Sequence, residues 1–235
     1  MAIIDYKSTP QARKLLAHLH RMDPGFDIDI IHPKQRWPNT EKRKSVEVMN
    51  IIRQHHQVSK NGLGNDIGFD AFVHRNRDAD LWIHILDKKK RIIGFSINEG
   101  YEIEGKTINY FRATIFNKAI QKSGIYPLLN ELKILIIPAD ILMVRTQNPV
   151  VYKYFTQLCD NHGLSVSPTV EKIDSDMVKL AKKLDPDVDE FSVHRKIFGG
   201  EALIGTPKPP PDIAPIWDRM NIYDGDILVI VGFPK

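Results

Sequence analysis

The sequence predicts a mixed α/β protein. An antiparallel meander is followed by a parallel crossover, helices cover both faces of the sheet, and a C-terminal extension follows. Stretches rich in Ile, Phe, Trp and Thr at 81–86, 91–99 and 106–116 are joined by short polar turns, which indicates the meander. Apolar residues at helical spacing precede and follow them. The helical segment after Phe116 leads to a buried strand at Ile141, and such a connection joins parallel strands.

The composition indicates a globular, intracellular protein. Of its 235 residues, 42% are hydrophobic and 26% are charged. The longest apolar stretches are far shorter than the roughly 20 residues of a membrane helix, so no membrane partner is expected. The N-terminus lacks the zones of a secretion signal, and the single cysteine, Cys159, cannot form an internal disulfide, so we expect a cytoplasmic location.

The net charge of +4 favours an anionic partner only mildly, because charges of both signs are interspersed. The longest basic runs are short, so nucleic acid is not expected as a partner. Nine histidines invite a metal hypothesis. His18 and His20, however, are two residues apart on a helix and point apart, and the spacing shows no ligand set, so no metal site is expected.

Before the meander, capping residues and prolines define the elements. Thr9 or Ser8 caps the first helix, and Pro33 and Pro38 favour a loop. In chain order we expect a strand at 2–6, a helix to about Met22, an irregular loop at 26–39, a helix from Thr40, and an edge strand at 68–74.

After the meander, helices and strands alternate. We expect a helix at 123–135, a strand at 141–145, helices at 149–161 and 170–184, a strand at 191–198, a Pro-rich loop at 206–215 and a final strand at 226–233. The final strand is too apolar to stand alone in water, and the strand at 191–198 is its expected hairpin partner. We therefore expect a single domain over 1–235, with a core of about 1–168 and an elaboration at 169–235 packed on it.

A ligand site is expected where the meander gives way to the crossover. The connection contains Gln121-Lys122-Ser123-Gly124 at the start of a helix. Unpaired backbone N–H groups and the positive end of the helix dipole make such a start suitable for a phosphate.

Two motifs resemble the GNAT superfamily of N-acetyltransferases. Gln121-Lys122-Ser123-Gly124-Ile125-Tyr126 resembles its pyrophosphate loop, Gln/Arg-x-x-Gly-x-Gly/Ala, and the segment from Arg145 to Asn148 with the aromatic helix after it resembles its Asn-led strand-to-helix segment. The resemblance implies a GNAT-like sheet that binds acetyl-CoA or another acyl-CoA as co-substrate. It implies contacts of the pantetheine arm with Ile115, Phe116 and Asn117, of the pyrophosphate with Gln121, Lys122, Ser123, Gly124, Ile125 and Tyr126, and of the thiol end with Asn148.

The chain departs from the family pattern in two places. Tyr126 stands where Gly or Ala usually lets phosphates approach the backbone, and Phe155 stands where the family has its acid tyrosine. Tyr152, one turn earlier, is the substitute acid that we expect. Glu99 is the candidate general base, because a carboxylate with a raised pKa can deprotonate an amine nucleophile.

The expected function is therefore coenzyme-A-dependent transfer of an acyl group, acetyl by preference, to an amine. The acceptor is a small-molecule amine or a protein, and neither its identity nor the oligomeric state follows from the sequence. One alternative is an acyl donor on an acidic acyl carrier protein, which a basic chain would suit. Another is a catalytically dead GNAT-like module that binds a partner, suggested by Tyr126 and Phe155.

Overall fold

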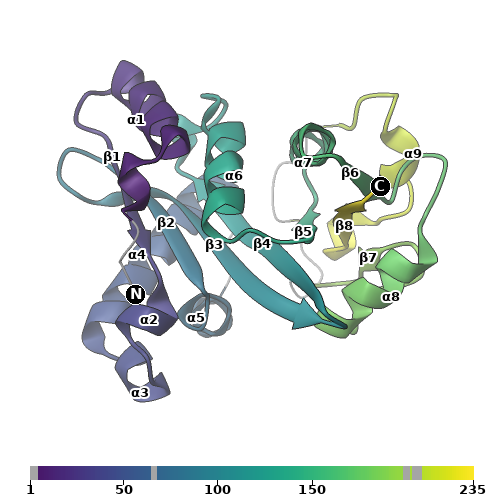
Figure 1. The fold of residues 1–235 in the computed structure, drawn as a ribbon, viewed down its shortest axis with the longest axis horizontal. Coiled ribbons are helices and arrows are strands. Elements are labelled where there is room, and N and C mark those ends of the chain that lie inside the picture. The colour runs from purple at the N-terminus through teal and green to yellow at the C-terminus, as the bar shows by residue number, and fades with distance from the viewer. Residues whose placement is uncertain (1–4, 65–67, 198–201, 203–207) are drawn as a thin grey trace. The chain divides into compact units, whose positions relative to one another are not determined.

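The computed structural model describes residues 5–64, 68–197, 202 and 208–235. The chain divides into two compact units, which are described separately. Unit 1 comprises Met1–Gly100 and Phe111–Pro138, and unit 2 comprises Tyr101–Tyr110 and Ala139–Lys235. Figure 1 labels the elements along the chain.

The first part of the chain alternates helices with the strands of the meander. Its elements are α1 (Pro10–Met22), β1 (Asp27–Ile31), α2 (Pro33–Arg36), α3 (Thr40–Arg43), α4 (Val46–Leu63), α5 (Phe69–Arg77), β2 (Leu81–Leu86), β3 (Ile92–Ile103), β4 (Lys106–Phe116) and α6 (Ile125–Ile136). The second part contains β5 (Ile141–Thr146), α7 (Pro149–Asn161), β6 (Leu164–Ser167), α8 (Ser175–Leu184), β7 (Val193–His194), α9 (Ala214–Trp217) and β8 (Ile227–Pro234).

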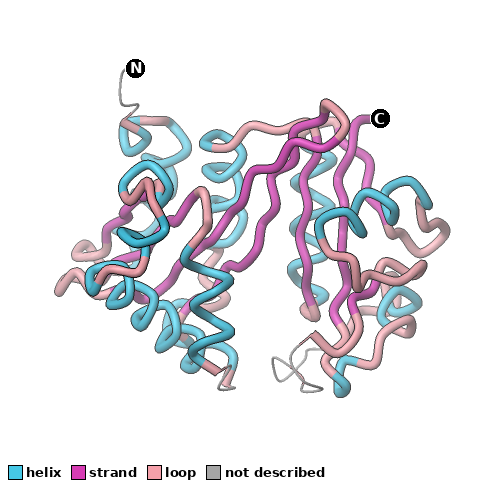
Figure 2. The backbone as a smooth tube through the Cα atoms, turned by 90° about the horizontal axis from the view of Figure 1, so that it is seen from below, coloured by secondary structure: helices cyan, strands magenta, loops and turns pink. Residues whose placement is uncertain are grey.

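The strands follow the order β1-β2-β3-β4-β5-β8-β6, and β7 pairs with β8. The pair β4–β5 is parallel, and the other main pairings are antiparallel. This arrangement confirms the predicted fold class, a mixed sheet whose meander passes through a helical crossover to a parallel strand. Figure 2 shows the strands in magenta with the helices in cyan beside them.

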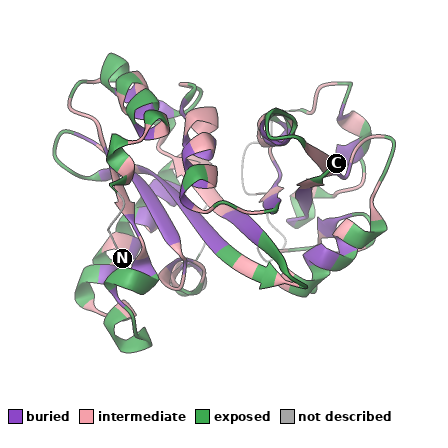
Figure 3. Cartoon of the chain, viewed as in Figure 1, coloured by how far each residue is buried: buried purple, intermediate pink, exposed green. Residues whose placement is uncertain are grey.

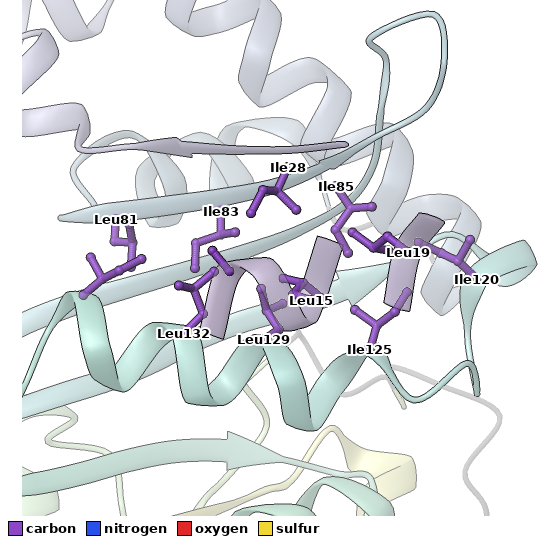
Figure 4. Close-up of a cluster of buried hydrophobic side chains, with 12 residues drawn as sticks. Leu15, Leu19, Ile28, Leu81, Ile83, Ile85, Ile120, Ile125, Leu129 and Leu132 are labelled. Atoms are coloured by element: carbon purple, nitrogen blue, oxygen red, sulfur yellow. The ribbon is translucent and has the colours of Figure 1, made fainter. Parts of the chain in front are cut away.

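In unit 1, helices cover both faces of the sheet. On one face, α1 and α6 pack on β2 through Leu15, Leu129 and Ile83 (Figure 4). On the other face, α4 and α5 pack through Ile52 and Phe72 against residues such as Trp82 and Phe95. The strands between these helices are accordingly buried, as the purple of β2 and β3 shows in Figure 3. Burial from both sides explains why β2 reads as a continuous apolar run.

The start of α1 matches its prediction closely. Thr9 occupies the N-cap position, its side chain accepts a hydrogen bond from the Ala12 N–H at 3.3 Å, and Pro10 follows as the first helical residue. Ala12, Leu15 and Leu19 form the buried face. A cap and an apolar stripe are local signals, and both can be read without knowledge of the tertiary fold.

Three predictions in the first hundred residues are wrong or lie outside the description. Of the strand expected at 2–6, residues 2–4 lie outside the described residues, and Tyr6–Ser8 form a 3-10 turn. The first strand is instead Asp27–Ile31, within the predicted loop, where it pairs with β2. The edge strand expected at 68–74 is the helix α5, because Phe69, Phe72 and Val73 have helical spacing.

The C-terminal segment also differs from the prediction in detail. The helix expected from Val170 begins at Ser175, where Asp174 caps it. The strand expected at 191–198 is a two-residue strand, Val193–His194, within the described part of that range. The final strand β8 pairs chiefly with β5 and with β6, a strand that the sequence did not indicate. None of the described helices is both long and apolar enough to cross a membrane.

Candidate functional site

The predicted phosphate site is the start of α6 in unit 1. Gly124 occupies the N-cap position with φ at +81°, a conformation that side chains rarely adopt, and it has no side chain with which to cap the helix. The helix has 12 residues, so its first N–H groups lie at the positive end of a full dipole. Pro127 removes one donor from this turn, and Ile125 and Tyr126 retain theirs. An anion would find two backbone donors here.

The loop before α6 is fixed by hydrogen bonds to its surroundings in unit 1. The Gln121 amide donates to the carbonyls of Phe116 at 3.0 Å and Gly62 at 2.9 Å. A ring nitrogen of His18 donates to the Ser123 carbonyl at 2.6 Å. Gln121 therefore shapes the loop through its side chain, whereas the side chain of Lys122 is exposed. A preformed loop loses less entropy on binding than a mobile one.

Tyr126 does not obstruct the helix start in the way that its position in the motif suggested. Its ring lies 5.5 Å from the Lys133 ammonium nitrogen, two turns further along α6, and the side chain is partly buried. Burial raises the pKa of Tyr126 to about 12, although a hydrogen bond with Asn130 opposes the rise. The phenol is thus a neutral packing group on the inner side of the helix.

The residues expected along the pantetheine arm end β4. Ile115 packs toward α4 and α5, and Phe116 packs toward α1 and α6. The Asn117 N–H donates to the Ile93 carbonyl at 2.9 Å. These contacts fix the end of β4. The predicted contact of these residues with the pantetheine arm of coenzyme A stays a prediction.

A buried lysine with no counterpart among the predicted site residues lies in α6, two turns after the helix start. Lys133 has no exposed surface, and its amine donates to the Thr114 hydroxyl at 2.5 Å and the Asn130 carbonyl oxygen at 2.9 Å. The Phe111 ring lies 4.6 Å away. Burial holds the pKa of Lys133 well below its usual value. Its position on the apolar face of α6, four residues after Leu129, was the available signal.

The expected general base, Glu99, lies on β3 in unit 1. Its carboxylate is 3.2 Å from the Arg112 guanidinium, and the two side chains are 12% and 23% exposed. The carboxylate is therefore held in place by an opposite charge, and any proton transfer by Glu99 would occur beside a guanidinium. Its catalytic role stays a prediction.

Asn148 and Tyr152 belong to α7 in unit 2. The Asn148 side chain caps the helix by accepting from the Val150 N–H at 3.0 Å. The Tyr152 hydroxyl donates to the Pro168 carbonyl at 3.0 Å, and burial raises the pKa of this tyrosine. Both side chains have structural partners here. The resemblance implies that Asn148 contacts the thiol end of the coenzyme whose pyrophosphate the loop before α6 binds. This contact stays a prediction.

Unit 2 also contains a polar cluster that the sequence analysis missed. Asp185, Asp187 and His194 bring ligand-type atoms within 4.8 Å of one another, and the Arg145 guanidinium lies 3.5 Å from Asp185. The end of α8 and the strand β7 supply these residues, so no sequence spacing links them. In unit 1, the buried His55 and His84 share a hydrogen bond of 2.8 Å.

Cys159 is buried in α7, and burial raises the pKa of its thiol to about 12. Its sulfur lies close to Gly232 of β8, where even a methyl group would collide with it. The residue therefore acts in packing, which agrees with the interpretation of a core position rather than a nucleophile.

Comparison with known proteins gives distant structural likenesses. No family model matches the chain, and no curated protein matches it. The ribosomal-protein-S18-alanine N-acetyltransferase from Escherichia coli has a TM-score of 0.45 at 10% identity, over 89% of this chain and 95% of that one. A GNAT family N-acetyltransferase (YhbS) from Escherichia coli, solved with CoA, has a TM-score of 0.41 at 12% identity, over 59% and 72%.

A third likeness is a GCN5-related glucosamine N-acetyltransferase region in a fungal multi-domain GH3 β-N-acetylglucosaminidase. Its TM-score is 0.43 at 10% identity over 72% of this chain, and this chain spans 20% of the length of that protein. Every one of these TM-scores is below 0.5, so the likenesses carry no functional conclusion for this chain.

Proposed function

We propose that this chain is a coenzyme-A-dependent N-acyltransferase, which transfers an acyl group, acetyl by preference, to an amine. The observation that carries the proposal is the open start of α6. Gly124 adopts a left-handed conformation, leaves the first N–H groups without a side-chain cap, and stands at the glycine of the motif Gln121 to Gly124. A diphosphate suits these donors and the dipole.

The remaining roles follow the resemblance. Ile115, Phe116 and Asn117 would contact the pantetheine arm, and Asn148 the thiol end. In the reaction, the amine nitrogen attacks the thioester carbonyl, the carbon–nitrogen bond forms as the carbon–sulfur bond breaks, and coenzyme A leaves as a thiol. Glu99 is the sequence's candidate for accepting the amine proton. Tyr152 would have to release the Pro168 carbonyl before it could protonate the thiolate.

Calorimetry of the whole chain with CoA and with acetyl-CoA tests the binding step. We expect saturable binding of both, weakened by inorganic pyrophosphate as a competitor. Mass spectrometry of an amine panel incubated with acetyl-CoA then tests transfer. Binding without any acylated product would indicate the dead module, and the lack of binding would contradict the coenzyme assignment.

The donor is the finer question, and a donor panel answers it. Acetyl-CoA, a long-chain acyl-CoA and an acylated carrier protein are compared at equal concentrations with the same amine. We expect acetyl-CoA to be the best donor. Preference for the carrier protein would favour the alternative that the basic pI of about 9.0 suggests.

A further inference from the structure

Two buried imidazoles of unit 1 connect helix α4 to the sheet. His55 belongs to α4 and His84 to β2, and both side chains are buried. The Phe95 ring of β3 stacks on the His55 ring, with the ring centroids 4.4 Å apart. The Nε2 atoms of the two histidines are 2.8 Å apart, so one of them donates a proton to the other. The groups at the two ends of the pair decide which one donates.

Asn76 of α5 fixes the proton of His55. The Asn76 amide nitrogen donates to the Phe72 carbonyl at 2.6 Å, so the Asn76 side-chain oxygen is the atom that faces His55. That oxygen lies 3.1 Å from Nδ1 of His55 and only accepts hydrogen bonds, so Nδ1 carries the proton. In the neutral ring, Nε2 of His55 is then an acceptor, and Nε2 of His84 donates to it. Nδ1 of a neutral His84 is therefore without a proton.

A first added proton fits this arrangement. Nδ1 of His84 faces the Asp29 carboxylate of β1 at 3.8 Å, and the Asp29 side chain is 43% exposed, so water reaches this end of the pair. A proton on Nδ1 places an imidazolium beside a carboxylate and keeps the hydrogen bond to His55. The other charged groups that act on this end are Lys7, Arg36 and, through its ion pair with Arg36, Glu47.

A second added proton does not fit. It would enter at Nε2 of His55 and place two N–H groups face to face at 2.8 Å, each on a buried cation. The rings that pack on His55, Phe95 and Trp82, offer no carboxylate. Burial lowers the pKa of both histidines, and the Asp29 carboxylate opposes this for His84, so His84 takes up its proton first. Once both are charged, the two imidazoles must separate.

Helix α4 connects His55 to the loop before α6. Asn61 and Gly62 lie in the last turn of this helix, roughly 9 to 10 Å beyond His55 at about 1.5 Å per residue. The Asn61 side-chain oxygen accepts a hydrogen bond from the Lys118 N–H at 2.9 Å. The Gly62 carbonyl accepts from the Gln121 amide at 2.9 Å. A movement of α4 away from the sheet therefore breaks two hydrogen bonds that shape the loop.

We propose that the pair of His55 and His84 is a pH-sensitive switch that controls the loop before α6. With no added proton or with one, α4 stays on the sheet and holds the loop in the shape that suits a diphosphate. With a second proton on His55, α4 loosens and the loop loses its contacts with Asn61 and Gly62. Acid therefore lowers the affinity of the loop for coenzyme A. The inference rests on the proposed function for its ligand, and the switch itself lies within unit 1.

Nuclear magnetic resonance of the whole chain tests the proton positions. At pH 7.5, long-range ¹H–¹⁵N spectra should show the proton of His55 on Nδ1 and that of His84 on Nε2. On acidification, His84 should become charged before His55. The opposite tautomers, or a His55 that stays neutral until the whole chain unfolds, would overturn the inference.

Hydrogen exchange tests the connection to the loop. The protection factor of the Lys118 N–H should fall about 10-fold or more as His55 becomes charged, while the amides of α1 keep their protection. His55→Gln keeps an oxygen that accepts from His84 but takes up no proton, so its Lys118 protection should not change with pH. His74→Gln, at an exposed position on α5, is the matched control and should behave as the wild type does. A Lys118 protection that stays constant while His55 becomes charged would overturn the inference.

Calorimetry with CoA over the same pH range separates this inference from the proposed function. Relative to His55→Gln, the wild type should lose about 10-fold or more in affinity over the pH range in which Lys118 loses its protection. Affinity that does not follow this protection would overturn the control of the site. If the wild type does not bind CoA at pH 7.5, the proposed function fails, and a loss of Lys118 protection would still establish the switch.

Discussion

The two units differ in how they accommodate their most deeply buried ionisable side chains. In unit 1, Lys133 and His55 hydrogen-bond to hydroxyl, amide and imidazole groups, and burial lowers the pKa of each. In unit 2, Arg145 and Asp185 form an ion pair in which each side chain is 9% exposed, and His194 adds a second partner. At its most deeply buried positions unit 1 thus holds neutral bases, and its pair of Glu99 and Arg112 is more exposed, whereas unit 2 buries paired charges. The first arrangement is sensitive to acid and the second to loss of a partner.

The starts of α6 and α7 show the same contrast. Asn148 caps an N–H group of α7 with its side chain, whereas α6 begins at Gly124 without a side-chain cap. Both helices follow a strand and both stand at positions that the sequence motifs marked. The comparison teaches that a motif position and an available binding group are separate properties, and only the start of α6 has both.

The largest expected effect is on the ion pair of unit 2. Arg145→Met leaves the buried Asp185 carboxylate without its guanidinium, so the free energy of unfolding should fall by about 3 to 5 kcal/mol. Urea denaturation measures the change. Lys179→Met, which removes an exposed ion pair with Asp176, should cost less than about 1 kcal/mol. An equal loss of unfolding free energy in the two variants would show that the buried ion pair of Arg145 stabilises unit 2 no more than an exposed one does.

The next effect is on the start of α6. Gly124→Glu should weaken CoA binding at least about 100-fold, because a carboxylate there repels a diphosphate at the helix start. Calorimetry measures the affinity. Gly124→Ala is the control, since it introduces the same strain at φ +81° without the charge. If Ala and Glu weaken binding equally, backbone strain and not the anion is responsible.

Acid should destabilise unit 1 through His55. Burial holds the pKa of His55 well below the usual 6.5, so the unfolded chain binds this proton before the folded one does. Above pH 6.5, His55 is neutral in both states and causes no loss of stability. Below pH 6.5, the free energy of unfolding falls by up to about 1.4 kcal/mol per pH unit. Urea midpoints between pH 7.5 and 5.0 measure the slope.

His84, whose pKa burial also lowers, adds to this effect, while an Asp29 carboxylate 3.8 Å away opposes it. The control His74→Ala should keep the wild-type slope, because His74 is exposed. A stability that does not change over this pH range would show that unit 1 accommodates the charged imidazoles.

The smallest effect is expected for Lys133. Lys133→Met keeps the shape of the side chain and loses the hydrogen bonds to Thr114 and Asn130, but it also removes an amine that the unfolded chain protonates more readily. The two contributions oppose each other, so stability should change by less than about 1.5 kcal/mol. The wild type should gain stability as pH rises toward 10, and the variant should lack this gain. A loss comparable to that of Arg145→Met would indicate a paired charge.

The sequence predicted elements whose signals are local. Thr9 and Pro10 mark the start of α1, and the helical crossover from β4 to β5 follows from the apolar pattern. The strand β1 was missed because Pro33 and Pro38 nearby favoured a loop, although Asp27 to Ile31 alternates polar and apolar residues. The short strand β6 depends on pairing with β8, which no local pattern encodes. The strand β7 does pair with β8, as predicted, but it is only two residues long.

The candidate site divides in the same way. The helix start at Gly124 could be predicted, because a glycine and a motif are visible in sequence. The packing of Tyr126 toward Lys133 could not, since a side-chain direction depends on what covers it. The hydrogen bond between His194 and Asp185 joins β7 to the residue that follows α8, a contact that the sequence pattern does not show.

The close approach of Gly62 to the end of β4 has a consequence for how affinity could be adjusted. A methyl group at residue 62 would press on the Phe116 carbonyl, the same oxygen that Gln121 uses to shape the loop before α6. Gly62→Ala should therefore move the loop from the far end of α4, without adding or removing any group that a ligand contacts. The last turn of α4 therefore sets the position of the loop before α6. Side chains of increasing size at position 62 should displace this loop by increasing distances.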